Sequence, residues 1–143
     1  AQRERAGIGR IPVGAGIRGV LKSLRAGRWV AMLADQDARR HGVFVPFMGR
    51  LSSTPEGPAR IALAAGVPLL FGTIRRDSPG GHRIEVLPPH APVGRPDDEA
   101  AVHALTAWHA ERLEHAVRAH PEHWFWLHRR WKTAPPDSTP ART

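Results

Sequence analysis

Residues 33–50, LADQDARRHGVFVPFMGR, join the end of an apolar run to a polar stretch. The run RWVAMLA (28–34) is short and apolar, which predicts a buried strand ending at DQD. Ligands bind outside the carboxyl ends of strands in open α/β sheets, so Asp35, Gln36 and Asp37 are candidate binding residues. Two carboxylates around an amide can bind a metal, orient a hydroxyl or receive a cation. A polar strand end that satisfies loop amides is the equally weighted alternative.

The sequence after DQD reads as a loop and then a helix. The stretch 38–53 contains glycines and a proline and is expected to be a loop with one extended, aromatic segment, VFVPF (43–47). Thr54 followed by Pro55 is typical of a helix start, because the hydroxyl can cap the first turn and proline has no N–H to lose. Gly66 is expected to end that helix.

The elements on either side follow from the same kinds of signal. Alternation of helices and strands predicts an α/β fold, with a small mixed sheet, at least partly parallel, flanked by helices. About three strands are too few to close a core on both faces, so we expect either oligomerisation or more of the sheet upstream of Ala1. The other expected elements are a helix over 17–24 ended by Gly27, strands over 67–76 and 82–88 joined by SPGG, a helix from Asp97 to Ala119 with Val102, Leu105, Leu113 and Val117 inside, a short helix from Pro121 that carries the tryptophans, and a disordered tail over 134–143.

Composition restricts the class of partner. The 143 residues fit one domain, and the absence of cysteine excludes disulfides and cysteine-based catalysis. The formal net charge of +8 favours an anionic partner, such as nucleic acid, a phosphorylated small molecule or a membrane surface. We find no apolar run long enough to span a membrane and no signal peptide. The start, AQRERAGIGR, has no initiator Met and suggests that a longer protein begins upstream.

Several basic and hydroxyl side chains follow DQD. Arg39, Arg40 and Arg50 flank the aromatic segment, and guanidinium groups suit phosphate, although a solvated loop explains them as well. Thr54 at a helix N-terminus can help to bind an anion, or it can act only as the cap, which we favour.

The histidines carry weaker signals. His109 and Glu114 have the H-x4-E spacing of an acyltransferase dyad, but on a continuous helix residues five apart point about 140° away from each other. They are therefore expected to be surface residues that share no proton. His120 and His123 lack a third ligand, so we expect no metal site.

The segment WFWLHRRWK (124–132) places three tryptophans and a phenylalanine among three cationic residues and a histidine. Indole rings and cations together are typical of the headgroup level of a bilayer. The same composition suits a platform for single-stranded nucleic acid. In the third interpretation, Trp124, Phe125 and Leu127 anchor a terminal helix in the core while the arginines extend outward.

Taken together, four segments resemble a known family. LADQD followed by GVFVPFMGR, then STPEGPARIALAAGVPLL, and finally HPEHWFWLHRRWK are similar to the C-terminal half of the lipid A biosynthesis lauroyl/myristoyl acyltransferases, in the lysophospholipid acyltransferase superfamily. The resemblance covers roughly residues 17 to 132, and the order and spacing of the segments make it specific. The family usually has a second aromatic residue where Met48 stands, a mild departure.

The resemblance implies a partial glycerolipid-acyltransferase-like α/β fold over residues 1–133, at the cytoplasmic face of the bacterial inner membrane. It implies transfer of a fatty acyl group from acyl carrier protein, or from coenzyme A, to a hydroxyl of a phosphorylated glycolipid, without a cofactor. In the family the general base is a His in an H-x4-D/E motif on the N-terminal side of the fold. HAERLE (109–114) does not match that motif's position, so we expect the base upstream of Ala1 and no activity from these 143 residues alone.

By similarity, Asp35 occupies the block that carries the acidic residue of the acceptor pocket, and Arg50 and Thr54 are candidates for the substrate's phosphate. We expect these groups to line one wall of a shared cleft. The expected substrate-binding residues are Asp35, Gln36, Asp37, Arg50, Thr54 and Pro68, the last within the hydrophobic block 67–69, and the expected membrane or lipid contacts are Trp124, Trp126, Arg129, Arg130, Trp131 and Lys132.

The sequence therefore predicts part of a membrane-associated acyltransferase acting on a lipid A precursor or a similar glycolipid, with an anionic membrane surface as a partner and no nucleic acid. A phosphatidylinositol mannoside acyltransferase is a close alternative. A non-catalytic basic module that binds anionic membrane or nucleic acid is the alternative from another class.

Overall fold

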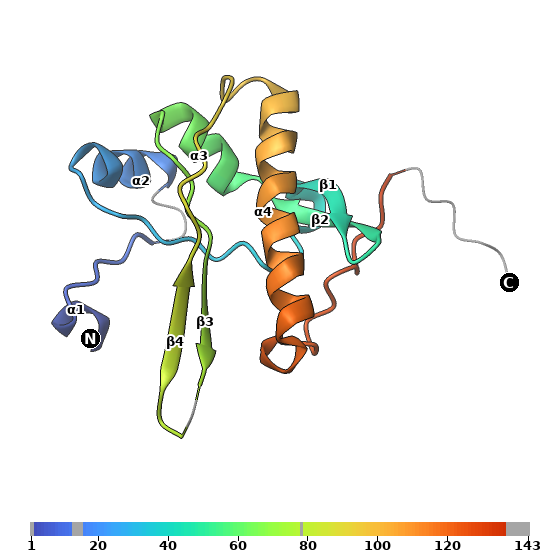
Figure 1. Cartoon of the computed structure of the whole chain (residues 1–143). Helices are drawn as coiled ribbons and strands as arrows, with labels where there is room; N and C mark the ends of the chain where they lie inside the picture. Colours follow the sequence, from blue (N-terminus) through green and yellow to red (C-terminus); the bar gives the residue numbers. More distant parts are fainter. Residues whose placement is uncertain (1, 13–15, 78, 137–143) are drawn as a thin grey trace, which may run out of the picture. The chain divides into compact units, whose positions relative to one another are not determined.

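The structure, a computed structural model, describes residues 2–12, 16–77 and 79–136. The chain separates into two compact units, Ala1–Ala31 and Met32–Thr143. The first contains α1 (Gln2–Arg5) and α2 (Gly16–Arg25) (Figure 1). The second helix confirms the one predicted over 17–24, and it ends before Gly27, whose φ of 69° suits a residue without a side chain.

The second unit combines two helices with two small sheets, which confirms the α/β class. Within the described residues, each sheet is a pair of antiparallel strands, so the expectation of parallel strands in one mixed sheet is wrong. In chain order the elements are η1 (Arg39–His41), β1 (Gly42–Phe47), β2 (Arg50–Pro55), α3 (Gly57–Ala65), β3 (Gly72–Arg76), β4 (His82–Val86), α4 (Glu99–Ala119) and η2 (Pro121–His123).

The hairpin β1–β2 replaces most of the loop predicted over 38–53. Phe47 pairs with Arg50, and the two residues between them, Met48 and Gly49, have φ values of 52° and 76°. Two positive φ values in a two-residue loop are typical of a type I′ turn, whose twist matches that of the strands. The Met48 N–H donates to Glu114 Oε2 of α4 at 2.6 Å, so the helix also stabilises this turn.

Two further predictions near DQD are wrong. Residues 28–34 form no strand, because a strand needs a hydrogen-bonded neighbour and no described residue pairs with them; Leu33 is exposed. Thr54 does not cap a helix, because it is the fifth residue of β2 and α3 begins three residues later, with Glu56 at the N-cap position. The predicted end of α3 at Gly66 is confirmed by its φ of 63°.

The core lies between α4 and the elements beside it. Val102 and Leu105 pack with α3, and Leu113 and Val117 pack with Phe47 of β1. All four belong to the face of the long helix that the sequence predicted to be buried, and they are buried. Figure 1 shows α4 running past both α3 and the β1–β2 hairpin.

The ribbon β3–β4 extends from the rest of the second unit (Figure 1), which confirms the antiparallel pair predicted over 67–76 and 82–88. Every residue of β4 is exposed. Arg75 Nη1 of β3 lies 2.6 Å from Nε2 of His120, the residue that follows α4. This contact joins the ribbon to the end of α4.

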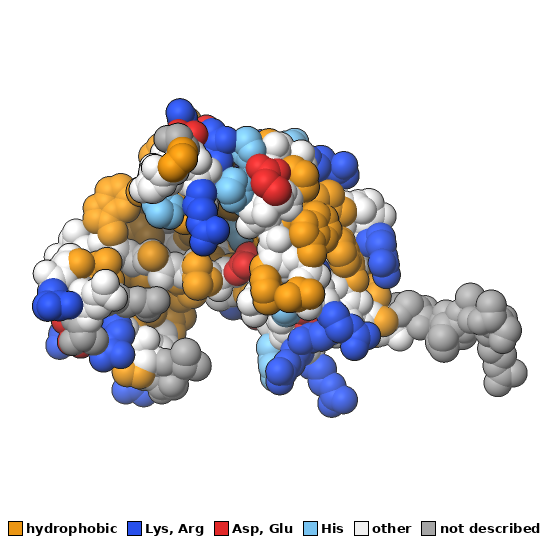
Figure 2. Space-filling model, turned by 90° about the horizontal axis from the view of Figure 1, so that it is seen from below, with side chains coloured by type: hydrophobic (Ala, Val, Ile, Leu, Met, Phe, Trp, Pro, Cys, Tyr) orange, Lys and Arg blue, Asp and Glu red, His pale blue; other side chains and the backbone are white. Residues whose placement is uncertain are grey.

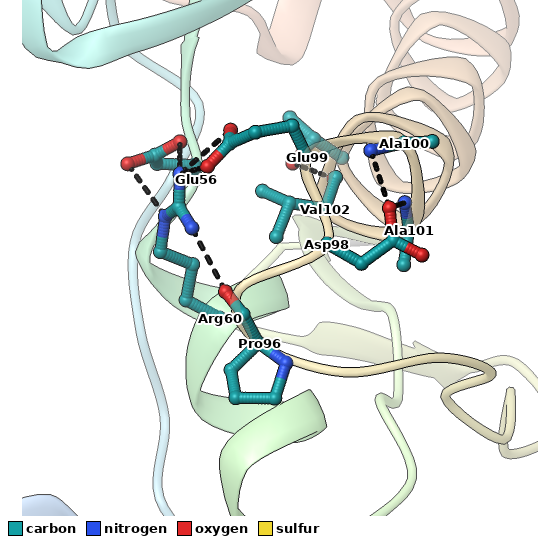
Figure 3. Close-up of polar contacts among 9 residues, drawn as sticks. Glu56, Arg60, Pro96, Asp98, Glu99, Ala100, Ala101 and Val102 are labelled. Atoms are coloured by element: carbon teal, nitrogen blue, oxygen red, sulfur yellow. Dashed lines mark hydrogen bonds and ion pairs between the residues drawn. The ribbon is translucent and has the colours of Figure 1, made fainter.

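Polar contacts join the start of α3 to the start of α4 (Figure 3). Arg60 forms ion pairs with Glu56 (2.8 Å) and Glu99 (2.9 Å) and donates to the Pro96 carbonyl. Hydrogen bonds to these two carboxylates hold the pKa of Arg60 above its ordinary value. The Asp98 carboxylate accepts hydrogen bonds from the two N–H groups at the first turn of α4, those of Ala100 and Ala101.

The end of the described chain is less helical than predicted. The helix from Pro121 is a single 3₁₀ turn, η2, and the tryptophans after it lie in successive turns instead of a helix. The predicted disordered tail falls mostly on residues 137–143, outside the described residues.

Replacing Asp98 by Ala should destabilise the protein by about 1 kcal/mol, because two N–H groups lose the acceptor that caps α4. Chemical denaturation followed by circular dichroism measures this change. Asp97→Ala is the matched control, since the Asp97 carboxylate pairs with the exposed Arg95 and caps no described N–H. Equal effects of the two substitutions would contradict the capping role of Asp98.

Candidate functional site

A fully buried arginine, Arg130, lies at the centre of the residues predicted to form the site. Its Nη1 donates to the Ser53 carbonyl oxygen at 2.7 Å, and its Nη2 donates to the Thr54 hydroxyl at 2.6 Å. Its guanidinium carbon lies 5.2 Å from the centre of the Phe47 ring. Arg130 therefore attaches the C-terminal segment to both strands of the β1–β2 hairpin.

The charge of Arg130 is buried and partly compensated. Burial holds its pKa below the ordinary value, and the negative charges of Asp37 and Asp35 oppose this shift without cancelling it. A buried charge without compensation is costly, so the two acids of DQD help to keep the guanidinium in this position. Its Nε has no hydrogen-bond partner in the described part of the chain.

Asp37 ties the C-terminal segment to the residues after DQD. One carboxylate oxygen accepts from the Arg39 N–H and the Thr133 hydroxyl, each at 2.9 Å, and the other accepts from the Thr133 N–H at 3.2 Å. The Asp37 N–H in turn donates to His128 Nε2 at 2.9 Å. Burial opposes ionisation of Asp37, but these hydrogen bonds outweigh it and hold its pKa below the ordinary value. This buried carboxylate serves the structure.

Asp35 has different surroundings. It is only partly buried, and its negative charge acts on both Arg130 and His109. His109, on α4, is partly buried, and its ring centre lies 6.4 Å from that of Phe71. The prediction that His109 is a surface residue is therefore wrong, although His109 and Glu114 do face different partners, as predicted.

The aromatic residues of the C-terminal segment divide between the core and the surface. Trp124 and Trp131 both contact Phe47, with ring centres 5.9 and 5.7 Å apart. Arg50 lies over Trp131, with its guanidinium carbon 5.4 Å from the ring centre. The remaining residues predicted to contact lipid, Trp126, Arg129 and Lys132, are exposed.

The predicted substrate-binding residues do not all come together. Thr54 accepts a hydrogen bond from Arg130, and the charges of Asp35 and Asp37 act on the same guanidinium. Arg50 instead contacts the segment through Trp131. Gln36 and Pro68 are exposed. A shallow hollow of about 560 Å³ contains none of the predicted residues; it is lined by Pro46, Ala104, Ala107, Trp108, Glu111, Glu114 and His115.

Sequence reasoning missed Ser53, His109 and Thr133 as members of this cluster. Ser53 and Thr133 sit in polar runs typical of loops, and their partners are more than 70 residues away in the chain. His109 had one usable signal, since it lies four residues before Leu113 and four after Leu105, along the buried face of α4.

Comparison with known proteins now identifies the family. The profile of the family described as "Bacterial lipid A biosynthesis acyltransferase" matches residues 1–133, which include the whole Arg130 cluster. The chain belongs to this family.

Named members of the family show moderate similarity. The chain is 34% identical over 129 residues to the lipid A biosynthesis lauroyltransferase of Escherichia coli (strain K12), which covers 88% of this chain and 40% of that protein. It is 31% identical over 122 residues to the palmitoleoyltransferase of the same strain, covering 83% of this chain and 38% of that protein. It is also 31% identical over 133 residues to a phosphatidylinositol mannoside acyltransferase of Mycobacterium tuberculosis (strain CDC 1551 / Oshkosh), covering 90% and 40%. The chain thus spans about two fifths of the length of these relatives.

Replacing Arg130 by Ala should destabilise the second unit by about 3 kcal/mol, because it leaves a cavity, two unpaired oxygens and two less compensated carboxylates. Thermal and chemical denaturation measure the loss. Arg129→Ala is the matched control: its side chain is exposed, so we expect a change within about 0.5 kcal/mol. If the two neighbouring substitutions cost the same, Arg130 does not hold the segment.

The pKa of His109 should lie below its ordinary value of 6.5, because burial and the charge of Arg130 disfavour the imidazolium. Asp35→Asn should lower this pKa further, since Asp35 favours the charged ring. Because the folded-state pKa is depressed, the contribution of His109 to stability is present above pH 6.5 and is lost as the pH falls below it.

NMR titration of the ring resonances tests both statements. A His109→Phe variant should show a weaker loss of stability between neutral and mildly acidic pH. A His109 pKa that does not change in Asp35→Asn would show that these two side chains are not coupled.

Proposed function

We propose that these residues form the C-terminal portion of a membrane-associated enzyme that acylates a phosphorylated glycolipid. The donor is a thioester of acyl carrier protein or coenzyme A, and the acceptor is a hydroxyl of a lipid A precursor or a similar glycolipid. The observation that carries the proposal is membership of the lipid A biosynthesis acyltransferase family over residues 1–133. The charge of +8 supports an acceptor that carries phosphate.

In this proposal the two acids of DQD have different tasks. Asp37 is buried and holds the C-terminal segment, whereas the partly exposed Asp35 is available to accept a hydrogen bond from the acceptor hydroxyl. The hydroxyl oxygen then forms the ester bond, the thioester C–S bond breaks, and the proton passes to a general base. We infer that this base belongs to an H-x4-D/E motif outside the 143 residues, because Glu114 is held by Met48 and Arg118, away from His109.

Membrane association belongs to the same proposal. None of the helices formed by the described residues is long and apolar enough to cross a bilayer. The exposed aromatic and cationic residues of the C-terminal segment support a peripheral contact with the cytoplasmic face of the inner membrane.

A second acceptor is favoured by one specific observation. The chain is 31% identical to a relative named phosphatidylinositol mannoside acyltransferase, close to its 34% identity with the lauroyltransferase. Both candidate acceptors are anionic lipids with sugar hydroxyls, so the same cationic surface suits either. Assays that offer each acceptor in turn separate them.

In an enzyme that carries this chain, Asp35→Ala should lower the rate of acyl transfer roughly 100-fold and leave the melting temperature nearly unchanged, because a positioned acceptor is lost from a partly exposed site. Asp37→Ala is the matched comparison and should lower the melting temperature first, since it removes three hydrogen bonds to the described chain. Acyl transfer from a radiolabelled thioester and differential scanning fluorimetry measure the two effects. Normal turnover with reduced stability in Asp35→Ala would assign Asp35 to the structure alone.

A further inference from the structure

The turn after α4 exposes three consecutive apolar side chains. Phe125, Trp126 and Leu127 have exposed fractions of 62%, 56% and 84%. Single exposed apolar residues are ordinary on protein surfaces, but large ones in a row indicate a surface that contacts something. We call residues 125–127 the apolar turn.

The apolar turn is held in place by anchors on both sides. Before it, Trp124 packs on Phe47; after it, His128 accepts from the Asp37 N–H and Arg130 is buried beside the hairpin. Within it, the His128 N–H donates to the Phe125 carbonyl at 3.1 Å, and the Trp126 indole N–H donates to the Pro121 carbonyl at 2.7 Å. The three side chains therefore cannot retreat into the core without breaking these contacts, and their exposure is built into the fold.

Two exposed cations, Arg129 and Lys132, follow the apolar turn in the chain. Arg118, on the last turn of α4, forms an ion pair with Glu114 at 2.7 Å. The nearby acid, Glu122, lies 3.5 Å from both His120 and His123. Figure 2 shows one face of the molecule on which hydrophobic side chains lie beside Lys and Arg.

We propose that the apolar turn inserts into the interface of an anionic bilayer, with Arg129 and Lys132 on lipid phosphates. This rests on the proposed function, which places the enzyme at a membrane, and it assigns the contact to residues 125–127 together with the two cations. Trp124, Trp131 and Arg130 face the protein and position the turn. An indole prefers the headgroup level, while phenyl and isobutyl groups enter the acyl boundary.

Leu127 favours a bilayer over single-stranded nucleic acid. Nucleic acid platforms bind bases by stacking them on aromatic rings, and an aliphatic side chain supplies no stacking surface. Leu127 is nevertheless the most exposed member of the apolar turn. In a bilayer the same side chain leaves water for hydrocarbon, which is favourable.

The test is co-sedimentation of the 143-residue chain with sucrose-loaded vesicles. One set contains equal parts of phosphatidylglycerol and phosphatidylcholine, and the other contains phosphatidylcholine alone. We expect binding to the first set, weakened by salt, and much weaker binding to the second. Leu127→Asp should reduce binding to the anionic vesicles at least about 10-fold, because burial of a large apolar side chain is replaced by a charge.

The matched control is Val93→Asp, which changes a side chain that is equally exposed, at 84%, in the segment before α4. Both variants should melt like the unchanged chain, and Val93→Asp should bind vesicles within about twofold of it, as one exposed charge alters the overall electrostatic attraction only slightly. Arg129→Glu combined with Lys132→Glu should abolish the preference for phosphatidylglycerol. Equal losses in Leu127→Asp and Val93→Asp, or displacement of the chain from vesicles by oligo-dT, would overturn the inference.

This result is separable from the proposed function. Suppose that Leu127→Asp changes neither vesicle binding nor acyl transfer by the intact enzyme to a detergent-dispersed acceptor. The proposed membrane contact of the apolar turn would then be refuted, and the proposed acyltransferase function would stand. If vesicle binding depends on Leu127 but the intact enzyme transfers no acyl group to either glycolipid, the proposed function would be refuted and the membrane contact would stand.

Discussion

The buried guanidinium of Arg130 is the interaction on which the second unit depends. It reaches across 76 and 77 residues of sequence to bond the end of β2, and it carries a charge that Asp35 and Asp37 partly compensate. A cation in such a place is stable only if its partners are correctly positioned, because leaving it unpaired is costly. The DQD segment, the hairpin and the C-terminal segment therefore form one polar cluster, and none of the three positions is independent of the others.

This constraint explains why apolar and basic residues are interleaved in WFWLHRRWK. The segment runs along the hairpin with Trp124, Arg130 and Trp131 turned toward it. Phe125, Trp126, Leu127, Arg129 and Lys132 are left outside. Adjacent residues of the same type thus serve opposite purposes: Arg130 closes the cluster and Arg129 remains in solvent. In the function proposed above, the inner side of the segment supports the acceptor site, and its outer side brings that site to the lipid surface.

Local signals in the sequence located α2, the buried face of α4 and the end of α3, but they misplaced the start of α3 and predicted a helix where η2 is a single 3₁₀ turn. The spacing of Val102, Leu105, Leu113 and Val117 identified the buried face of α4, and Gly66 marked the end of α3, because helical periodicity and left-handed glycine are properties of neighbouring residues.

Strand pairing depends on distant residues and was harder to predict. The run 28–34 has the composition of a strand but no partner among the described residues. Ser52 and Ser53 were predicted to lie in a loop and Thr54 to cap a helix, yet all three are fully buried. Their polar groups can be buried because partners such as Arg130 satisfy them, which no local pattern reveals. The family resemblance predicted that Asp35 and Thr54 line one cleft, but it could not separate the buried acid, Asp37, from the partly exposed one, Asp35.

Hydrogen exchange of the Asp37 and Thr133 amides tests the central claim most directly, because both N–H groups bond across the junction between DQD and the C-terminal segment. The account predicts slow exchange of both amides in the unchanged chain and fast exchange in Arg130→Met. The Val67 amide, which bonds to Ala62 at the end of α3, should stay protected in both proteins. Fast exchange of the Asp37 and Thr133 amides in the unchanged chain, or protection that survives the loss of the guanidinium, would contradict it.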